Sequence, residues 1–158
     1  MAVQGRSDLT SVPFFLSGNT IVRDNETILT NGARSTPLKQ YTLMAQVASS
    51  RKWVPLTSLT ALDGSNTARG IYVGDDIPAA TIVAGDVANC PIVVAGSAAT
   101  FDSSQLVIEN SLALTSVASE TATGTDANGP VHTRLVQDDL AHIGLFAEST
   151  VDIDYFEN

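Results

Sequence analysis

Apolar and polar residues alternate most clearly from residue 41 onward. The apolar positions of this stretch are Tyr41, Leu43, Ala45 and Val47, and they fall on one face of a strand. Ser49, Ser50 and Arg51 then favour a turn, after which residues 53–56 return as a second strand. The pattern predicts a hairpin with its tip in solvent and an apolar face that buries Trp53.

Further short strands are predicted at residues 70–73, 81–84, 92–95 and 145–153, between Gly, Pro, Asp or Asn residues. Two helices are also predicted. One covers residues 103–112 behind Asp102 as N-cap, and the other covers residues 131–143 and ends at Gly144. We therefore expect a mainly β (α+β) fold with a compact small β-barrel or sandwich-like body and two short helices.

Residues 1–36 have no sustained hydrophobic period and are rich in Gly, Ser, Thr and Asn. Only two stretches indicate strands, the β-branched TILT at residues 27–30 and residues 20–22. The chain is therefore predicted to divide into an extended N-terminal arm, residues 1–36, and a body, residues 37–158.

The composition is that of a folded protein of one domain: 158 residues, 44% hydrophobic and 16% charged. A single cysteine, Cys90, excludes an intramolecular disulfide and is expected to be buried and inert. The opening sequence MAVQGRSDLT lacks the apolar stretch of a secretory signal. No apolar run reaches the length of about 18 residues that a membrane span needs, so no membrane association is expected.

Charge is distributed unevenly along the chain. Residues 1–69 hold seven cations and four acids, a net charge of +3, whereas residues 70–158 hold one cation and thirteen acids, a net charge of −12. The front of the chain is thus expected to meet an anionic surface, and the acidic remainder disfavours direct binding of nucleic acid. An acidic surface that only maintains solubility explains the same numbers.

Catalytic signatures are missing: the sequence has no GxSxG, no P-loop and no GxGxxG. Asp138, Asp139 and His142 fall within about one helical turn and could present a metal. A solvated acidic helix face with a histidine near its C-terminus explains them as well. We therefore expect no enzyme, no cofactor and no bound metal.

Several short segments carry a resemblance to a known family. They are Pro37-Leu38, Leu43-Met44, Ser49-Ser50-Arg51-Lys52 before a strand that begins Trp53-Val54, then Asp63-Gly64 and Ala68-Arg69-Gly70-Ile71. In order and spacing the chain resembles the head decoration proteins of lambda-like tailed bacteriophages. The resemblance covers about residues 37–153, although the loop at 113–130 and the tail past Asp152 are longer than the family pattern.

The resemblance implies a β-rich homotrimer without enzymatic activity, which binds the major capsid protein on the outer surface of the virion after synthesis in the host cytoplasm. It also implies that an N-terminal arm becomes ordered on the capsid and adds a strand there. The candidate capsid-binding residues of the arm are Arg6, Arg23, Thr27, Ile28, Leu29, Thr30 and Arg34. The candidate hairpin or subunit-interface residues are Arg51, Lys52 and Trp53.

Two other classes of function remain open from the sequence. A head-fibre or tail domain that binds carbohydrate would need clustered aromatic residues, whereas Trp53, Tyr41, Tyr72 and Tyr155 are scattered. A small metal-dependent hydrolase would have to use Asp138, Asp139 and His142.

Overall fold

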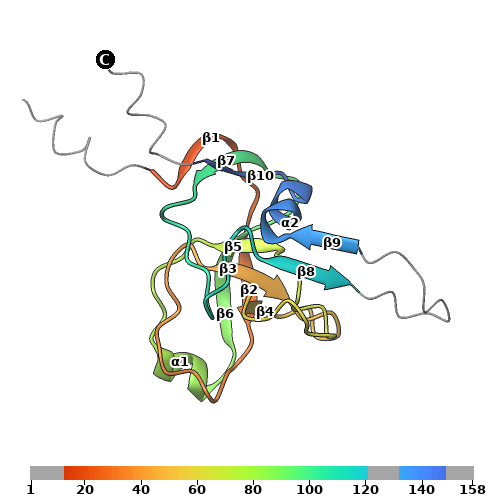
Figure 1. Ribbon diagram of the computed structural model, residues 1–158. Coiled ribbons are helices and arrows are strands. Elements are labelled where there is room, and N and C mark those ends of the chain that lie inside the picture. The colour runs from red at the N-terminus through yellow and green to blue at the C-terminus, as the bar shows by residue number, and fades with distance from the viewer. Residues whose placement is uncertain (1–12, 121–131, 149–158) are drawn as a thin grey trace, which may run out of the picture.

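The computed structural model describes residues 13–120 and 132–148 and has a mainly β fold with two helices, as predicted (Figure 1). The elements in chain order are β1 (Phe15–Asn19), β2 (Val22–Ile28), β3 (Leu43–Gln46), β4 (Trp53–Pro55), β5 (Gly70–Tyr72), α1 (Ala79–Ala84), β6 (Val87–Val93), β7 (Ala98–Asp102), β8 (Val117–Glu120), β9 (His132–Leu135), α2 (Val136–His142) and β10 (Leu145–Glu148). Within the described residues, no helix has the length and apolarity needed to cross a membrane.

Five strands form a closed barrel in the order β2-β4-β3-β5-β6. The predicted hairpin is its centre: β3 and β4 are antiparallel, with Gln46 opposite Trp53. The barrel closes where β2 runs parallel to β4, at Ile28 opposite Trp53, and there the Leu29 N–H donates to the Trp53 carbonyl at 2.9 Å. β2 and β4 share only one register pair, so we infer that side-chain packing around Trp53 does much to hold these two strands together.

A second sheet has the order β1-β7-β10 and lies at the opposite end of the molecule from α1 (Figure 1). Two glycines with φ of +90° bring its strands and their connections close together. A Cβ on Gly18 would lie 2.0 Å from the Ala98 carbonyl oxygen, and one on Gly144 would lie 1.7 Å from that of Ser97. Gly144 comes immediately after Ile143, the C-cap of α2, which confirms the predicted end of this helix.

The alternating faces predicted for residues 41–47 are both buried, because β3 lies between two apolar clusters. Leu43 and Ala45 belong to one cluster, with Phe101 and Leu140. Met44 belongs to the other, which also contains the Trp53 side chain. Burial on both faces explains why Met44, on the face opposite Leu43 and Ala45, is apolar and fully buried.

The predicted arm is corrected for residues 13–36, which are part of the body. Phe14 is buried and stacks on Tyr41 with ring centroids 4.0 Å apart, while β2 pairs with both β4 and β6. Most of β2 is exposed and only Ile28 is fully buried, so backbone pairing with distant strands stabilises β2. Such pairing leaves no local hydrophobic period. Residues 1–12, including Arg6, lie outside the described residues.

The helix predicted at residues 103–112 is wrong. The carboxylate of Asp102 accepts hydrogen bonds from the Ser104 N–H at 3.0 Å and the Ser104 hydroxyl at 2.7 Å, which makes a local turn. Farther on, Val107 exchanges backbone hydrogen bonds with Tyr41 and Leu43 at 3.0 and 2.8 Å. An aspartate at this position is typical of a turn as well as of a helix start. Here the backbone pairing of Val107 with Leu43 of β3 excludes the helix.

Three other elements differ from the prediction. The strand expected at residues 92–95 is the end of a longer strand, β6, which begins at Val87 and ends at Val93. The strand expected at residues 81–84 is the helix α1, which follows Pro78 with its helix-compatible φ of −57° and buries Ile82. The second predicted helix, residues 131–143, is shorter in the structure: α2 covers Val136–His142, because residues 132–135 form β9 and pair with β8. The predicted last strand is seen as β10, and its remaining residues, 149–153, lie outside the described part of the chain.

Candidate functional site

The predicted hairpin presents a strained turn next to a buried indole. Arg51 has a φ of +60°, and the Gln46 side-chain amide holds this turn by donating to the Arg51 carbonyl at 2.7 Å. Trp53 is only 3% exposed, which confirms that it is buried. Its Nε1–H donates to Glu26 Oε2 at 2.7 Å, so the polar atom of the indole is also satisfied.

A concavity of about 190 Å³ lies beside this hairpin, at one end of the barrel, and it gathers three guanidinium groups. We call Arg23, Arg51 and Arg69 the arginine surface. Arg23 is on β2, Arg51 is in the turn between β3 and β4, and Arg69 immediately precedes β5. Trp53, Val94 and Ile143 line the same concavity and supply apolar contact area.

The strand registers explain why these arginines meet. β3 is antiparallel to both β4 and β5, which brings the end of β3 next to the starts of its two neighbours. β6 is antiparallel to β2 and β5, and its last residue, Val93, is opposite both Val22 and Ile71. The arginine surface therefore depends on long-range pairing of several strands and not on one sequence motif.

Gly70 makes room for the floor of this concavity. A Cβ at Gly70 would lie 2.6 Å from the Val93 carbonyl oxygen and 3.1 Å from Trp53 Cζ3. Only glycine therefore lets the indole and β6 approach β5 this closely. This contact gives a structural reason for the Arg-Gly pair in the segment Ala68-Arg69-Gly70-Ile71.

Two of the three guanidinium groups are available to a partner. Arg23 lies 3.7 Å from Glu26 and its side chain is 61% exposed. Arg51 and Arg69 are both exposed, and neither guanidinium makes an ion pair or hydrogen bond with the described residues. In a chain of net charge −9, free positive charge concentrated in one place favours contact with an anionic group.

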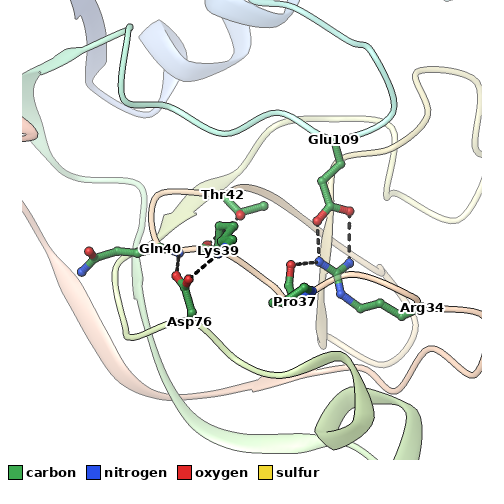
Figure 2. A network of polar contacts seen from close by, with 7 residues as sticks. All are labelled: Arg34, Pro37, Lys39, Gln40, Thr42, Asp76 and Glu109. Atoms are coloured by element: carbon green, nitrogen blue, oxygen red, sulfur yellow. Dashed lines mark hydrogen bonds and ion pairs between the residues drawn. The ribbon is translucent and has the colours of Figure 1, made fainter.

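Arg34, another predicted capsid contact, points its guanidinium at Glu109 and the Pro37 carbonyl (Figure 2). Its side chain is 5% exposed and forms a two-pronged ion pair with Glu109, with N–O distances of 2.5 and 3.1 Å. The same guanidinium donates to the Pro37 carbonyl at 3.0 Å. Arg34 therefore ties the segment after β2 to the segment after β7, and it is not accessible to a capsid partner.

The TILT segment, also predicted as a capsid contact, is already paired within the barrel. Ile28 is 1% exposed, and Leu29 donates its N–H to Trp53. Thr30 donates its hydroxyl to the Ile82 carbonyl at 2.8 Å and its N–H to Asp86 at 2.8 Å. Thr27, within β2, is half-buried. Of the described arm candidates, Arg23 alone keeps a mostly exposed charged side chain.

Lys52 of the hairpin is held by an ion pair with Asp86, which follows α1. The hydrogen bond from Lys52, together with that from the Thr30 N–H, lowers the pKa of Asp86 below its ordinary value of 3.8. A lowered pKa in the folded state contributes stability at pH values above 3.8, and this contribution is lost as the pH falls through the folded pKa. The pair thus links the hairpin to the connection between α1 and β6 in a pH-dependent way.

Replacing Asp86 with Asn is therefore expected to lower stability at pH 7 and to have progressively less effect below about pH 4. Urea unfolding of the wild type and the variant across this pH range measures the difference. Asp24→Asn, at another exposed aspartate, is the control and should change stability little at either pH. A difference between wild type and Asp86→Asn that stays constant down to about pH 2 would contradict this role of Asp86.

The acidic group on α2 is structural. Asp139 is 8% exposed and pairs with Arg134, with a distance of 2.8 Å between Oδ1 and Nε. Asp138 is exposed and accepts the Leu135 N–H at 2.9 Å, which caps α2. The prediction of a solvated helix face thus holds for Asp138 and His142 and is wrong for Asp139. Among the residues that the structure describes, no three His, Cys, Asp or Glu side chains are grouped to hold a metal.

Comparison with family models, with curated proteins and with solved structures finds no match to the chain.

Proposed function

We propose that this protein is a phage capsid decoration protein, which binds the outer surface of an expanded head as a trimer and cements neighbouring major capsid proteins. One observation supports the proposal: the short segments that resemble the family lie together in the fold and contribute buried residues. Leu38, Leu43, Met44, Trp53 and Ile71 come from four of these segments, and each is at most 3% exposed in or beside one barrel. Residues that build the two apolar clusters on either side of β3 are those that a shared fold would preserve.

An exposed sheet edge offers a way to bind a shell. β1 is the outer strand of its sheet and pairs on one side with β7, so its other edge is open to an added strand among the described residues. Ile21 and Val22, just after β1, are 46% and 40% exposed and add apolar area nearby. A strand from a capsid protein could join this edge, with residues 1–12 entering directly before it.

The energetics of cementing follow from mass action. A protein that binds only the intact shell stabilises it by about 2.7 kcal/mol per site when its concentration is about 100 times Kd. Summed over the many equivalent sites of a shell, this binding free energy opposes the internal pressure of packaged DNA.

The aromatic residues fit the carbohydrate-binding alternative poorly, because Trp53 and Tyr72 are each 3% exposed and Tyr41 is stacked on Phe14.

The test is addition of purified protein to expanded, undecorated heads of its own phage. We expect the protein to sediment with the heads and to raise the temperature at which they lose DNA. The informative truncation removes residues 1–12 only, because removal of residues 1–36 would also delete β1 and β2 from the body. We expect the shorter chain to remain folded by circular dichroism and to protect the heads less.

Failure of the full-length protein to sediment with the heads would overturn the proposed function. Equal protection by the truncated and full-length proteins would instead exclude residues 1–12 as a capsid contact. The contact would then lie on the body, where substitutions along β1 would locate it.

A further inference from the structure

The arginine surface has the chemistry of a docking site for carboxylates. Arginine presents a planar set of N–H donors that matches a carboxylate in a bidentate geometry. Arg51 and Arg69 are exposed and unpaired within the described residues, and the nearby Glu26 carboxylate already accepts the Trp53 Nε1–H. Positive charge is therefore available to an outside anion.

The apolar lining of the concavity indicates which kind of anionic ligand would fit. Val94, Ala95 and Ile143 line it beside the buried Trp53, so apolar groups meet the guanidinium groups in one place. A segment that mixes acidic and apolar side chains would satisfy both. Nucleic acid fits less well, because the thirteen acids of residues 70–158 repel a phosphate backbone.

The chain itself contains a segment of this kind. Residues 151–158, which lie outside the described part of the structure, read VDIDYFEN. Asp152, Asp154 and Glu157 supply three carboxylates, and the residues between them include Ile153 and Phe156. These carboxylates are the chemical complement of Arg51 and Arg69, the two cations of the arginine surface that are unpaired within the described residues.

We propose that residues 151–158 of a second copy of this chain dock on the arginine surface. The donor is a second copy because the proposed function, on which this step rests, requires copies of the chain to assemble as a trimer, and this contact would join them. Each copy then gives its segment to one neighbour and receives one from another, an arrangement that closes into a ring when the rotation between neighbours closes.

A peptide titration tests the chemistry of the surface without any capsid, so its result is separate from that of the proposed function. Labelled peptide VDIDYFEN is titrated with the full-length protein and followed by fluorescence anisotropy. We expect the double variant Arg51→Gln, Arg69→Gln to bind it about tenfold or more weakly than the wild type. The matched control, Lys39→Glu, also lowers the net charge by two at an exposed position outside the concavity and should bind like the wild type.

If the control Lys39→Glu weakens binding as much as the double variant does, the effect comes from net charge alone and the proposal is overturned. The proposal also fails if the neutral peptide VNINYFQN binds as well as VDIDYFEN, or if a single-stranded oligonucleotide binds the surface more tightly than the peptide. Binding of VDIDYFEN should also weaken as salt is raised.

Sedimentation velocity of the full-length protein then tests whether the docked residues 151–158 come from a second copy of the chain. We expect the larger species that form as protein concentration rises to be lost in Arg51→Gln, Arg69→Gln and in Asp152→Asn, Asp154→Asn, Glu157→Gln. Mixing these two variants supplies one intact surface and one intact segment, so pairs with one copy of each variant should form in the mixture, without the larger species of the wild type. Species that stay unchanged in both variants, or a mixture that does not associate, would overturn docking between copies.

Discussion

Replacing Asp139 with Ala is expected to lower the free energy of unfolding by about 3–5 kcal/mol, because it leaves a largely buried guanidinium without its carboxylate. The side chains of Asp139 and Arg134 are 6% and 19% exposed. Asp139 Oδ2 also accepts the Ala68 N–H at 3.2 Å, and Arg134 donates to Thr67 Oγ1 at 2.9 Å. The pair therefore fastens α2 and β9 to the segment that leads into β5.

Chemical denaturation followed by circular dichroism measures this loss. Asp138→Asn is the matched control: it removes a charge from the adjacent position of α2, is exposed, and should cost about 1 kcal/mol or less through the helix cap. Replacing both partners, as Arg134→Met with Asp139→Leu, should restore much of the stability, since no buried charge is then left unpaired. Equal effects of Asp139→Ala and Asp138→Asn would contradict the importance of the pair.

The sequence predicted those parts of the fold in which local pattern and tertiary contacts agree. The β3–β4 hairpin was predictable because β3 alternates between two buried clusters and a polar turn separates it from β4. The burial of Trp53 followed from the same pattern. β5 and the end of α2 at Gly144 were marked by glycines that the packing requires.

The parts that could not be predicted depend on partners far away in the chain. β2 is mostly exposed and its pattern is that of an arm, because its pairing with β6 and β4 leaves no trace in its own hydrophobic pattern. Asp102 is an equally good signal for a turn and for a helix cap. Arg23 and Arg51 are both candidates from the sequence, but their approach to Arg69 exists only once the barrel has closed.

Replacing Trp53 with Ala is expected to lower the free energy of unfolding by about 3–5 kcal/mol, because it opens a cavity where the barrel closes. The indole is 3% exposed and belongs to the cluster that contains Ile28 and Ile92. Trp53 also carries the single register pair between β4 and β2. Loss of its packing therefore weakens the seam of the barrel as well as the core. Circular dichroism is the appropriate measurement, since the variant has no tryptophan fluorescence.

Trp53→Phe separates packing from hydrogen bonding at this seam. Phenylalanine keeps an aromatic ring in place but cannot donate to Glu26, so we expect an intermediate loss of about 1–3 kcal/mol. Adding free indole should partly restore the stability of Trp53→Ala if the cavity stays open and apolar, as engineered apolar cavities bind small aromatic molecules. Wild-type stability of Trp53→Ala would mean that the indole does not hold the seam. The floor of the arginine surface would then have to be stabilised by β5 and β6 instead.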